Sequence, residues 1–180
     1  MKKILLALFS LAFLTAGAQT ADEVIQKYAA NLGGLEAFNK IKTAKMTGSI
    51  TTQGMTLPVV TQIVNNKAMR TEVQVMDQQI VNVYNNGTGW KINPYDGAET
   101  ATEVTGTQLN EFKWQASLVN HLMDYKNRGH KVELLGQEDV EGVKTTKIKL
   151  TSKDDGKVTT YFISTSTNLL VKSVSKREVA

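Results

Sequence analysis

The sequence of 180 residues contains no cysteine and only two histidines. The lack of cysteine excludes disulfide bonds, thiolate metal ligands, cysteine nucleophiles and lipid attachment at an N-terminal cysteine. The histidines, His121 and His130, have no carboxylate near them at a metal-ligand spacing, so we expect solvated side chains rather than a zinc site. We therefore expect no metal and no cofactor.

Sequence patterns typical of enzymes are also missing. There is no Gly-x-Ser-x-Gly nucleophile elbow and no phosphate-binding loop. The carboxylate pairs have structural explanations, because Asp22 and Glu23 suit a helix N-terminus and Asp154-Asp155 suits a hairpin turn. We therefore expect a protein that is not an enzyme, and an enzyme without a recognisable motif is the minor alternative.

Lysine and arginine form no long run, although the formal net charge is +4. Two of these charges, Lys2 and Lys3, precede an apolar run and an Ala-Gly-Ala ending. A basic start, an apolar segment too short to span a bilayer and an Ala-x-Ala ending are typical of a signal peptide. We predict a signal peptide over 1–18, cut between Ala18 and Gln19, and hence a periplasmic or secreted protein. The absence of a basic run argues against nucleic acid as a partner.

Turn residues divide much of the remaining chain into short β segments rich in Val, Ile, Thr and Met. Breaks such as Gln53-Gly54 and Asp155-Gly156 are typical of antiparallel hairpins. Pro58 cannot donate to a strand ladder, so its segment is predicted to be an edge strand or to carry a bulge. The predicted strands cover 43–52, 55–65, 68–76, 79–85, 89–93, 130–138, 141–151, 157–164 and 168–176.

Three helical segments are predicted. Thr20 and Glu23 have the spacing of a capping box, and apolar residues at helical spacing follow as far as Gly33-Gly34. A shorter helical segment continues over 35–41. A long helix is predicted over 107–128, with an apolar arc of roughly 220°, whereas a surface helix needs little more than about 100°. This helix should be enclosed on two sides or face a hollow, which points to a hydrophobic cavity.

Four segments, in this order, resemble the outer-membrane lipoprotein carrier (LolA/LolB-like) superfamily. Residues 28–38 carry a double glycine before a short helix. Residues 81–94, VNVYNNGTGWKINP, resemble the family's strand, Gly-containing turn, tryptophan and Asn-Pro. Residues 134–142 resemble its G-x-E-x-x-x-G hairpin, and residues 161–172 resemble its F-I-D-x-x-T-x-L-P-x-K hairpin.

The resemblance implies a mainly β fold with helices (α+β). It would be a strongly curved antiparallel sheet or incomplete β-barrel, with the helix over 107–128 as its lid. We expect a single domain over 19–180. Family members tend to run further, so the chain is expected to be a short form or to be truncated at its C-terminus.

The resemblance also implies a non-catalytic periplasmic carrier or sensor, acting in lipoprotein transport to the outer membrane in the manner of a chaperone. It would bind the acyl chains of lipoproteins or lipids in a hydrophobic cavity. The alternative is a structural or interaction module of the envelope with a filled core, which would bind a protein partner by strand addition. The predicted cavity residues are Met46, Ile50, Leu57, Val59, Ile63, Met69, Val73, Val75 and Trp90 from the sheet, and Phe112, Val119, Leu122 and Met123 from the lid.

Overall fold

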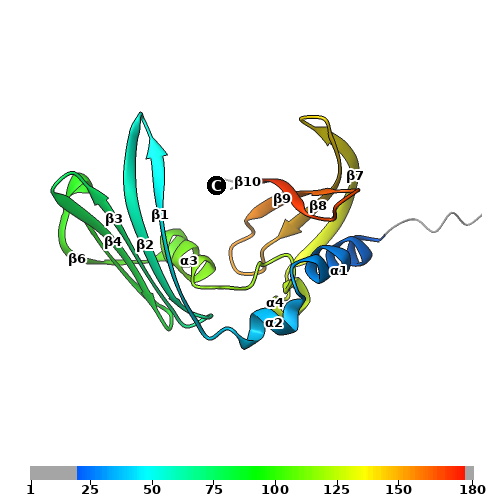
Figure 1. Cartoon of the computed structure of the whole chain (residues 1–180). Coiled ribbons are helices and arrows are strands. Elements are labelled where there is room, and N and C mark those ends of the chain that lie inside the picture. The colour runs from blue at the N-terminus through cyan, green and yellow to red at the C-terminus, as the bar shows by residue number, and fades with distance from the viewer. Residues whose placement is uncertain (1–19, 177–180) are drawn as a thin grey trace, which may run out of the picture.

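A computed structural model describes residues 20–176, so the predicted signal peptide lies outside the described residues. The chain forms two antiparallel sheets, with the helices where the two sheets come together (Figure 1). The sheets do not close into a barrel. The predicted fold class, mainly β with helices, is confirmed.

The six-stranded sheet is a meander in the order β1-β2-β3-β4-β5-β6. The sequence predicts its first five strands to within one residue at each end. It does not predict the sixth, because that strand is polar and buries only its terminal residues, Ala98 and Val104. The strands are β1 (Thr43–Thr52), β2 (Met55–Val64), β3 (Ala68–Val75), β4 (Gln78–Asn85), β5 (Thr88–Asn93) and β6 (Ala98–Val104).

Pro58 lies in β2, which pairs with both β1 and β3 and is therefore not an edge strand. However, the ladder between β2 and β3 begins only at the Val59–Val73 pair. Pro58 thus occupies a stretch of β2 that is paired on one side only, where a missing N–H is tolerated.

The four-stranded sheet has the order β10-β9-β8-β7 and is packed against the first helices. The capping box is confirmed, because the Thr20 hydroxyl accepts the Glu23 N–H and the Glu23 carboxylate accepts the Thr20 N–H, both at 3.2 Å. The elements are β7 (Lys131–Val140), β8 (Val143–Thr151), β9 (Val158–Ser164), β10 (Leu170–Lys176), α1 (Ala21–Asn31) and α2 (Leu35–Lys40), with a 3-10 turn, η1 (Pro94–Asp96), between β5 and β6.

The prediction of one long helix over 107–128 is wrong. Two helices, α3 (Gly106–Gln115) and α4 (Tyr125–Arg128), are separated by an irregular segment over 116–124. Polar side chains satisfy two backbone N–H groups of this segment in place of helical bonds. The Asn65 side chain accepts the Leu118 N–H at 3.0 Å, and the Asn120 side chain accepts the Leu122 N–H at 2.8 Å.

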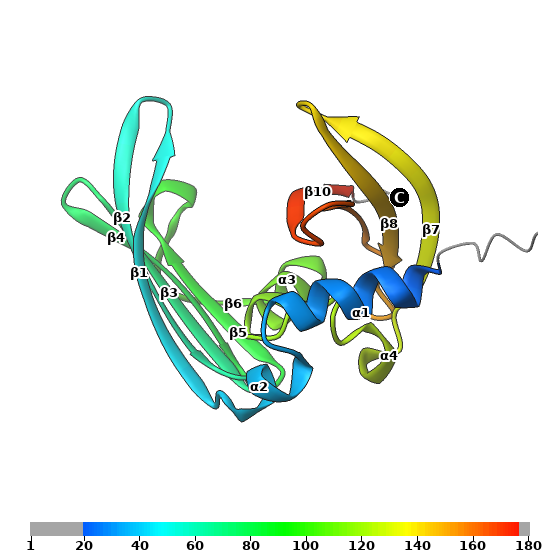
Figure 2. The ribbon, with the colours of Figure 1, turned by 45° about the vertical axis from the view of Figure 1, so that its right-hand side comes forward.

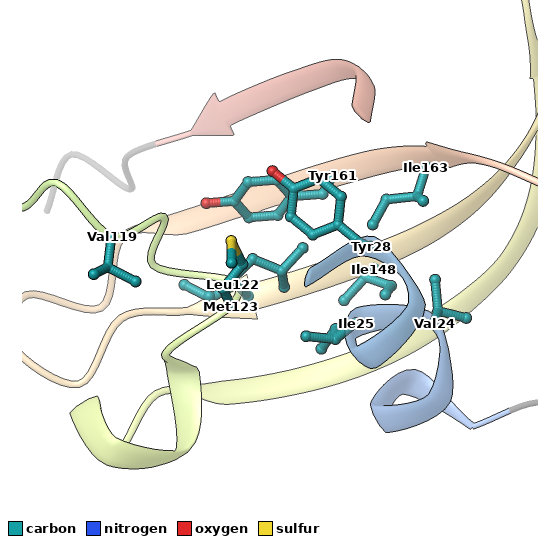
Figure 3. Packing of buried hydrophobic residues seen from close by; sticks show 10 residues of the cluster. Val24, Ile25, Tyr28, Val119, Leu122, Met123, Ile148, Tyr161 and Ile163 are labelled. Atoms are coloured by element: carbon teal, nitrogen blue, oxygen red, sulfur yellow. The ribbon is translucent and has the colours of Figure 1, made fainter. Parts of the chain in front are cut away.

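The apolar core consists of two clusters. On the four-stranded sheet, α1 and the segment over 116–124 bury ten side chains, nine of which Figure 3 labels. On the six-stranded sheet, α3 buries Phe112 and Ala116 against one end of the strands. Trp114, on the same helix, packs against the first cluster. Helix α3 therefore has contacts with the core clusters of both sheets, although most apolar residues of the predicted arc lie outside this helix. Within residues 20–176, no helix is long and apolar enough to cross a bilayer.

Candidate functional site

The two faces of the six-stranded sheet have different surroundings. We name the face that carries Ile63, Met69 and Tyr84 the inner face, because these paired residues pack under α3. The opposite face, which carries Arg70 and Val83, is the outer face. Figures 1 and 2 show that α3 lies on the side of this sheet that is turned toward the four-stranded sheet.

Helix α3 covers the inner face at one end only. Beyond it lies a mainly polar row in which the Thr61 and Thr71 hydroxyls are 3.1 Å apart. Among residues 20–176, no helix buries the apolar side chains at the edge of this row and beyond it: Met46, which pairs with Thr61 in the row, is 49% exposed, and Ile50, beyond the row, is 47% exposed. We name this set the open inner surface, and it consists of Met46, Ile50, Leu57, Val59, Val73, Val75 and Ile80.

Eight of the nine predicted cavity residues of the sheet share the inner face. Ile63 and Met69 lie under α3, and the other six belong to the open inner surface. Trp90 does not join them, because it pairs with Val83 on the outer face. Its neighbour Gly89 takes the inner position, where an added Cβ would lie 2.7 Å from a Val104 methyl carbon. The close approach of α3 leaves no room for a side chain there.

The four predicted lid residues fill the core. Phe112 belongs to the cluster under α3, and Val119, Leu122 and Met123 belong to the cluster on the four-stranded sheet (Figure 3). Three of these residues lie in the irregular segment and not on a helix. Phe112, Val119 and Leu122 are closed off by this packing, whereas Met123 also lines the hollow beside α1 described below. Their role in ligand binding stays a prediction.

The expectation that the histidines are solvated is wrong. His121 and His130 are buried, and their rings meet at 3.2 Å between Nδ1 of His121 and Nε2 of His130. Nε2 of His121 lies 3.1 Å from the Trp114 carbonyl, and the Lys153 N–H donates to Nδ1 of His130. Every one of these bonds is satisfied when both rings are neutral, with Nε2 carrying the proton.

The ring of Trp114 stacks on His121 with centroids 3.4 Å apart. Burial, with a smaller contribution from nearby Arg128, lowers the pKa of His121 to about 3. Burial also lowers the pKa of His130. The pair therefore joins α3, the irregular segment and β7 as a neutral unit. The sequence offers no signal for this contact except the two histidines themselves.

A hollow of about 430 Å³ lies between α1 and the residues around α4. Its apolar lining includes Ile25, Leu35 and Met123. At its rim, Lys126 and Tyr125 bind the Asp22 carboxylate, and these hydrogen bonds lower the pKa of Asp22. Within residues 20–176, no three His, Asp or Glu side chains are grouped so that they could hold a metal ion.

Similarity to known proteins is found at the level of the fold. No protein-family model matches the sequence, and no curated protein matches it. The chain is similar to a LolA superfamily protein from Nitrosomonas europaea, with a TM-score of 0.52 and 11% identity over 89% of this chain and 73% of that one. It is also similar to a DUF1329 family protein from Desulfovibrio piger, with a TM-score of 0.51 and 12% identity over 89% of this chain and 75% of that one. The fold is therefore LolA-like, as the sequence motifs predict.

Proposed function

We propose that the protein is a non-catalytic carrier in the periplasm that binds acyl chains of lipids or lipoproteins. The observation that carries this proposal is the open inner surface, where apolar side chains on four neighbouring strands are exposed on β1 and half-buried on β2, β3 and β4. Large apolar patches are rare on proteins that work alone in water. The fold shared with a LolA superfamily protein supports the same function by analogy.

Acyl chains would bind by burial against this surface. Each methylene removed from water contributes about 0.8 kcal/mol. The four-stranded sheet also leaves apolar side chains uncovered on its helix-packed face, where Leu134 pairs with Ile148 and Leu170 pairs with Ile163. An acyl chain between the sheets would therefore find apolar groups on both, while the polar row of Thr61 and Thr71 would mark the deep end of the site.

The direct test is organic extraction of natively purified protein followed by mass spectrometry, together with titration of a fluorescent fatty acid. We expect lipid in the extract and saturable binding of the probe. Met46→Asp combined with Ile50→Asp should weaken probe binding at least tenfold, because a charge would replace apolar contact. The control is Ser49→Asp, which places a charge on the outer face of the same strand.

Two results would contradict the proposal. One is protein without lipid that also leaves the fatty acid unbound. The other is equal loss of binding in the control variant. If such a protein instead retained a specific protein from an envelope extract, strand addition at β1 or β10, which end their sheets among the described residues, would be the better function.

A further inference from the structure

The outer face of the six-stranded sheet is hollowed near the turn that joins β2 to β3. One hollow of about 590 Å³ spans β1 to β4, and a second of about 540 Å³ shares Val64 with it and extends over the turn. The side chains that the first hollow gathers on the outer face are Thr43, Lys45, Gln62, Val64, Ala68, Arg70, Val83 and Asn85.

The described residues that line these adjoining hollows include four with a positive charge and none with an acidic side chain. Lys45 and Arg70 line the first hollow, and Lys42 and Lys67 line the second. Lys45 and Lys67 have no ion pair within residues 20–176. Glu72, on the same face, binds the Arg70 guanidinium at 2.5 Å. Four cations with one acid beside them leave this end of the face positively charged.

Apolar side chains stay exposed among these cations. Val64 is 41% exposed and Trp90 is 36% exposed, and Trp90 pairs with Val83 at the edge of the first hollow. Ile41, next to Lys42, is also exposed. Tryptophan and aliphatic residues beside lysine and arginine are typical of surfaces that sit at the headgroup level of a membrane.

We propose that this face docks the protein on an anionic lipid surface. Lys45 and Arg70 are two strands apart in register, about 10 Å, so they can hold phosphates of one or two neighbouring headgroups. Lys67 would add a third contact, while Val64 and Trp90 enter the interface. An uncharged surface would match only the tryptophan. Tryptophan also occurs at protein interfaces, so an acidic protein is the alternative occupant that the vesicle test separates from lipid. Glu103, which pairs with Trp90 on the side away from the cations, would lie at the border of the docked face.

Membrane docking is a separate function from cargo binding. The proposed docking residues lie on the outer face of the sheet and the proposed cargo surface on the inner face, so variants can test each function alone. The test is co-sedimentation with vesicles of phosphatidylglycerol and phosphatidylethanolamine, compared with vesicles of phosphatidylcholine alone, at low salt and at roughly 0.5 M salt. We expect binding to the anionic vesicles only, lost at high salt. Lys45→Glu with Lys67→Glu should weaken it about tenfold or more. Lys144→Glu with Lys153→Glu, the same charge change on the other half of the protein, should leave it unchanged.

Tryptophan emission reports the contact. The emission of Trp90 should shift to shorter wavelength on anionic vesicles, and the shift should vanish in Trp90→Phe, because Trp114 stays stacked on His121. Circular dichroism would confirm that each variant is folded. Equal binding to both kinds of vesicle, full binding by the Lys45/Lys67 variant, or binding without a Trp90 shift would overturn the proposal. Fatty acid titration of the Lys45/Lys67 variant should be normal, which separates docking from cargo binding.

Discussion

The two sheets meet the same helical region in different ways. The four-stranded sheet is covered by α1 and by residues 119–123, and its cluster holds ten buried side chains. The cluster on the six-stranded sheet holds six, all at the end where α3 packs. Because burial of apolar side chains is the main source of stability, the four-stranded half should carry more of it. The six-stranded half keeps apolar surface free on one face and cations free on the other.

This difference implies that different residues provide the stability of the protein and its proposed binding of cargo. A residue that a carrier uses for cargo has to be reachable, so it cannot also be a fully buried core residue. The open inner surface meets this requirement, whereas Phe112, Val119 and Leu122 do not in this conformation. Three predictions test the comparison, beginning with the largest effect.

Leu122→Ala should destabilise the protein by about 2–5 kcal/mol, because Leu122 is fully buried at the centre of the larger cluster (Figure 3). The measurement is the free energy of unfolding from urea denaturation. Ile50→Ala, on the open inner surface, should cost less than about 0.5 kcal/mol. Similar losses in both variants would show that the open inner surface is core rather than binding surface.

Acid should weaken the contact between the two halves. The pKa of His121 is lowered to about 3 from an ordinary 6.5, so below pH 6.5 the unfolded chain binds more protons than the folded one. The free energy of unfolding should therefore fall by about 2 kcal/mol between pH 7 and pH 5, with a further loss from His130. Arg128 and Lys157 also disfavour a charged His121, while its hydrogen bond to the Trp114 carbonyl acts in the opposite direction. Asp154, Asp155 and Asp124 raise the pKa of His130, but burial and Arg128 outweigh them, so the pKa of His130 is still lowered.

The control for this prediction is His121→Gln, which keeps a donor toward the Trp114 carbonyl and cannot titrate. Its unfolding free energy should vary less with pH over the same range. The pKa values of Asp22, Asp96 and Asp154 are lowered, so the contribution of these carboxylates to stability is lost mainly as the pH falls below their ordinary pKa of 3.8. A wild-type protein equally stable at pH 7 and pH 5 would refute a neutral buried pair.

The histidines also show where sequence reasoning succeeds and fails. Local signals located the strands, because turn residues such as Asp155-Gly156 act over a few positions. One helix does not form over 107–128 because contacts from far along the chain interrupt its helical pattern, above all the hydrogen bond that the Leu118 N–H donates to the Asn65 side chain. His121 and His130 are nine residues apart, and only the turn made by the irregular segment brings their rings together.

The candidate site was predictable in part for the same reason. Alternation within a strand places Met46 with Ile50, Leu57 with Val59 and Val73 with Val75, without any knowledge of the fold, but only the register between strands shows that the three pairs share one face. Alternation cannot say which face α3 will cover, or that Gly89 rather than Trp90 points toward it. The cationic outer face was missed because Lys45 and Arg70 lie on strands that are not adjacent in the sheet, so no run in the sequence marks them.

The smallest expected effect comes from Gly→Ala substitutions, which compare the part of the inner face that α3 covers with the open part. Gly89→Ala should destabilise the protein by about 1–2 kcal/mol, because the new Cβ would lie 2.7 Å from a Val104 carbon and 2.9 Å from a Leu109 carbon, which must shift. Gly48 lies on the same face, two inner-face positions along β1 from Ala44, which pairs with Ile63 under α3. A Cβ added at Gly48 meets nothing closer than a Val59 methyl carbon at 4.0 Å. Gly48→Ala should be neutral or stabilise the strand by up to about 1 kcal/mol. Thermal unfolding of the two variants measures the contrast, and a loss at Gly48 as large as that at Gly89 would mean that the open inner surface is covered in solution.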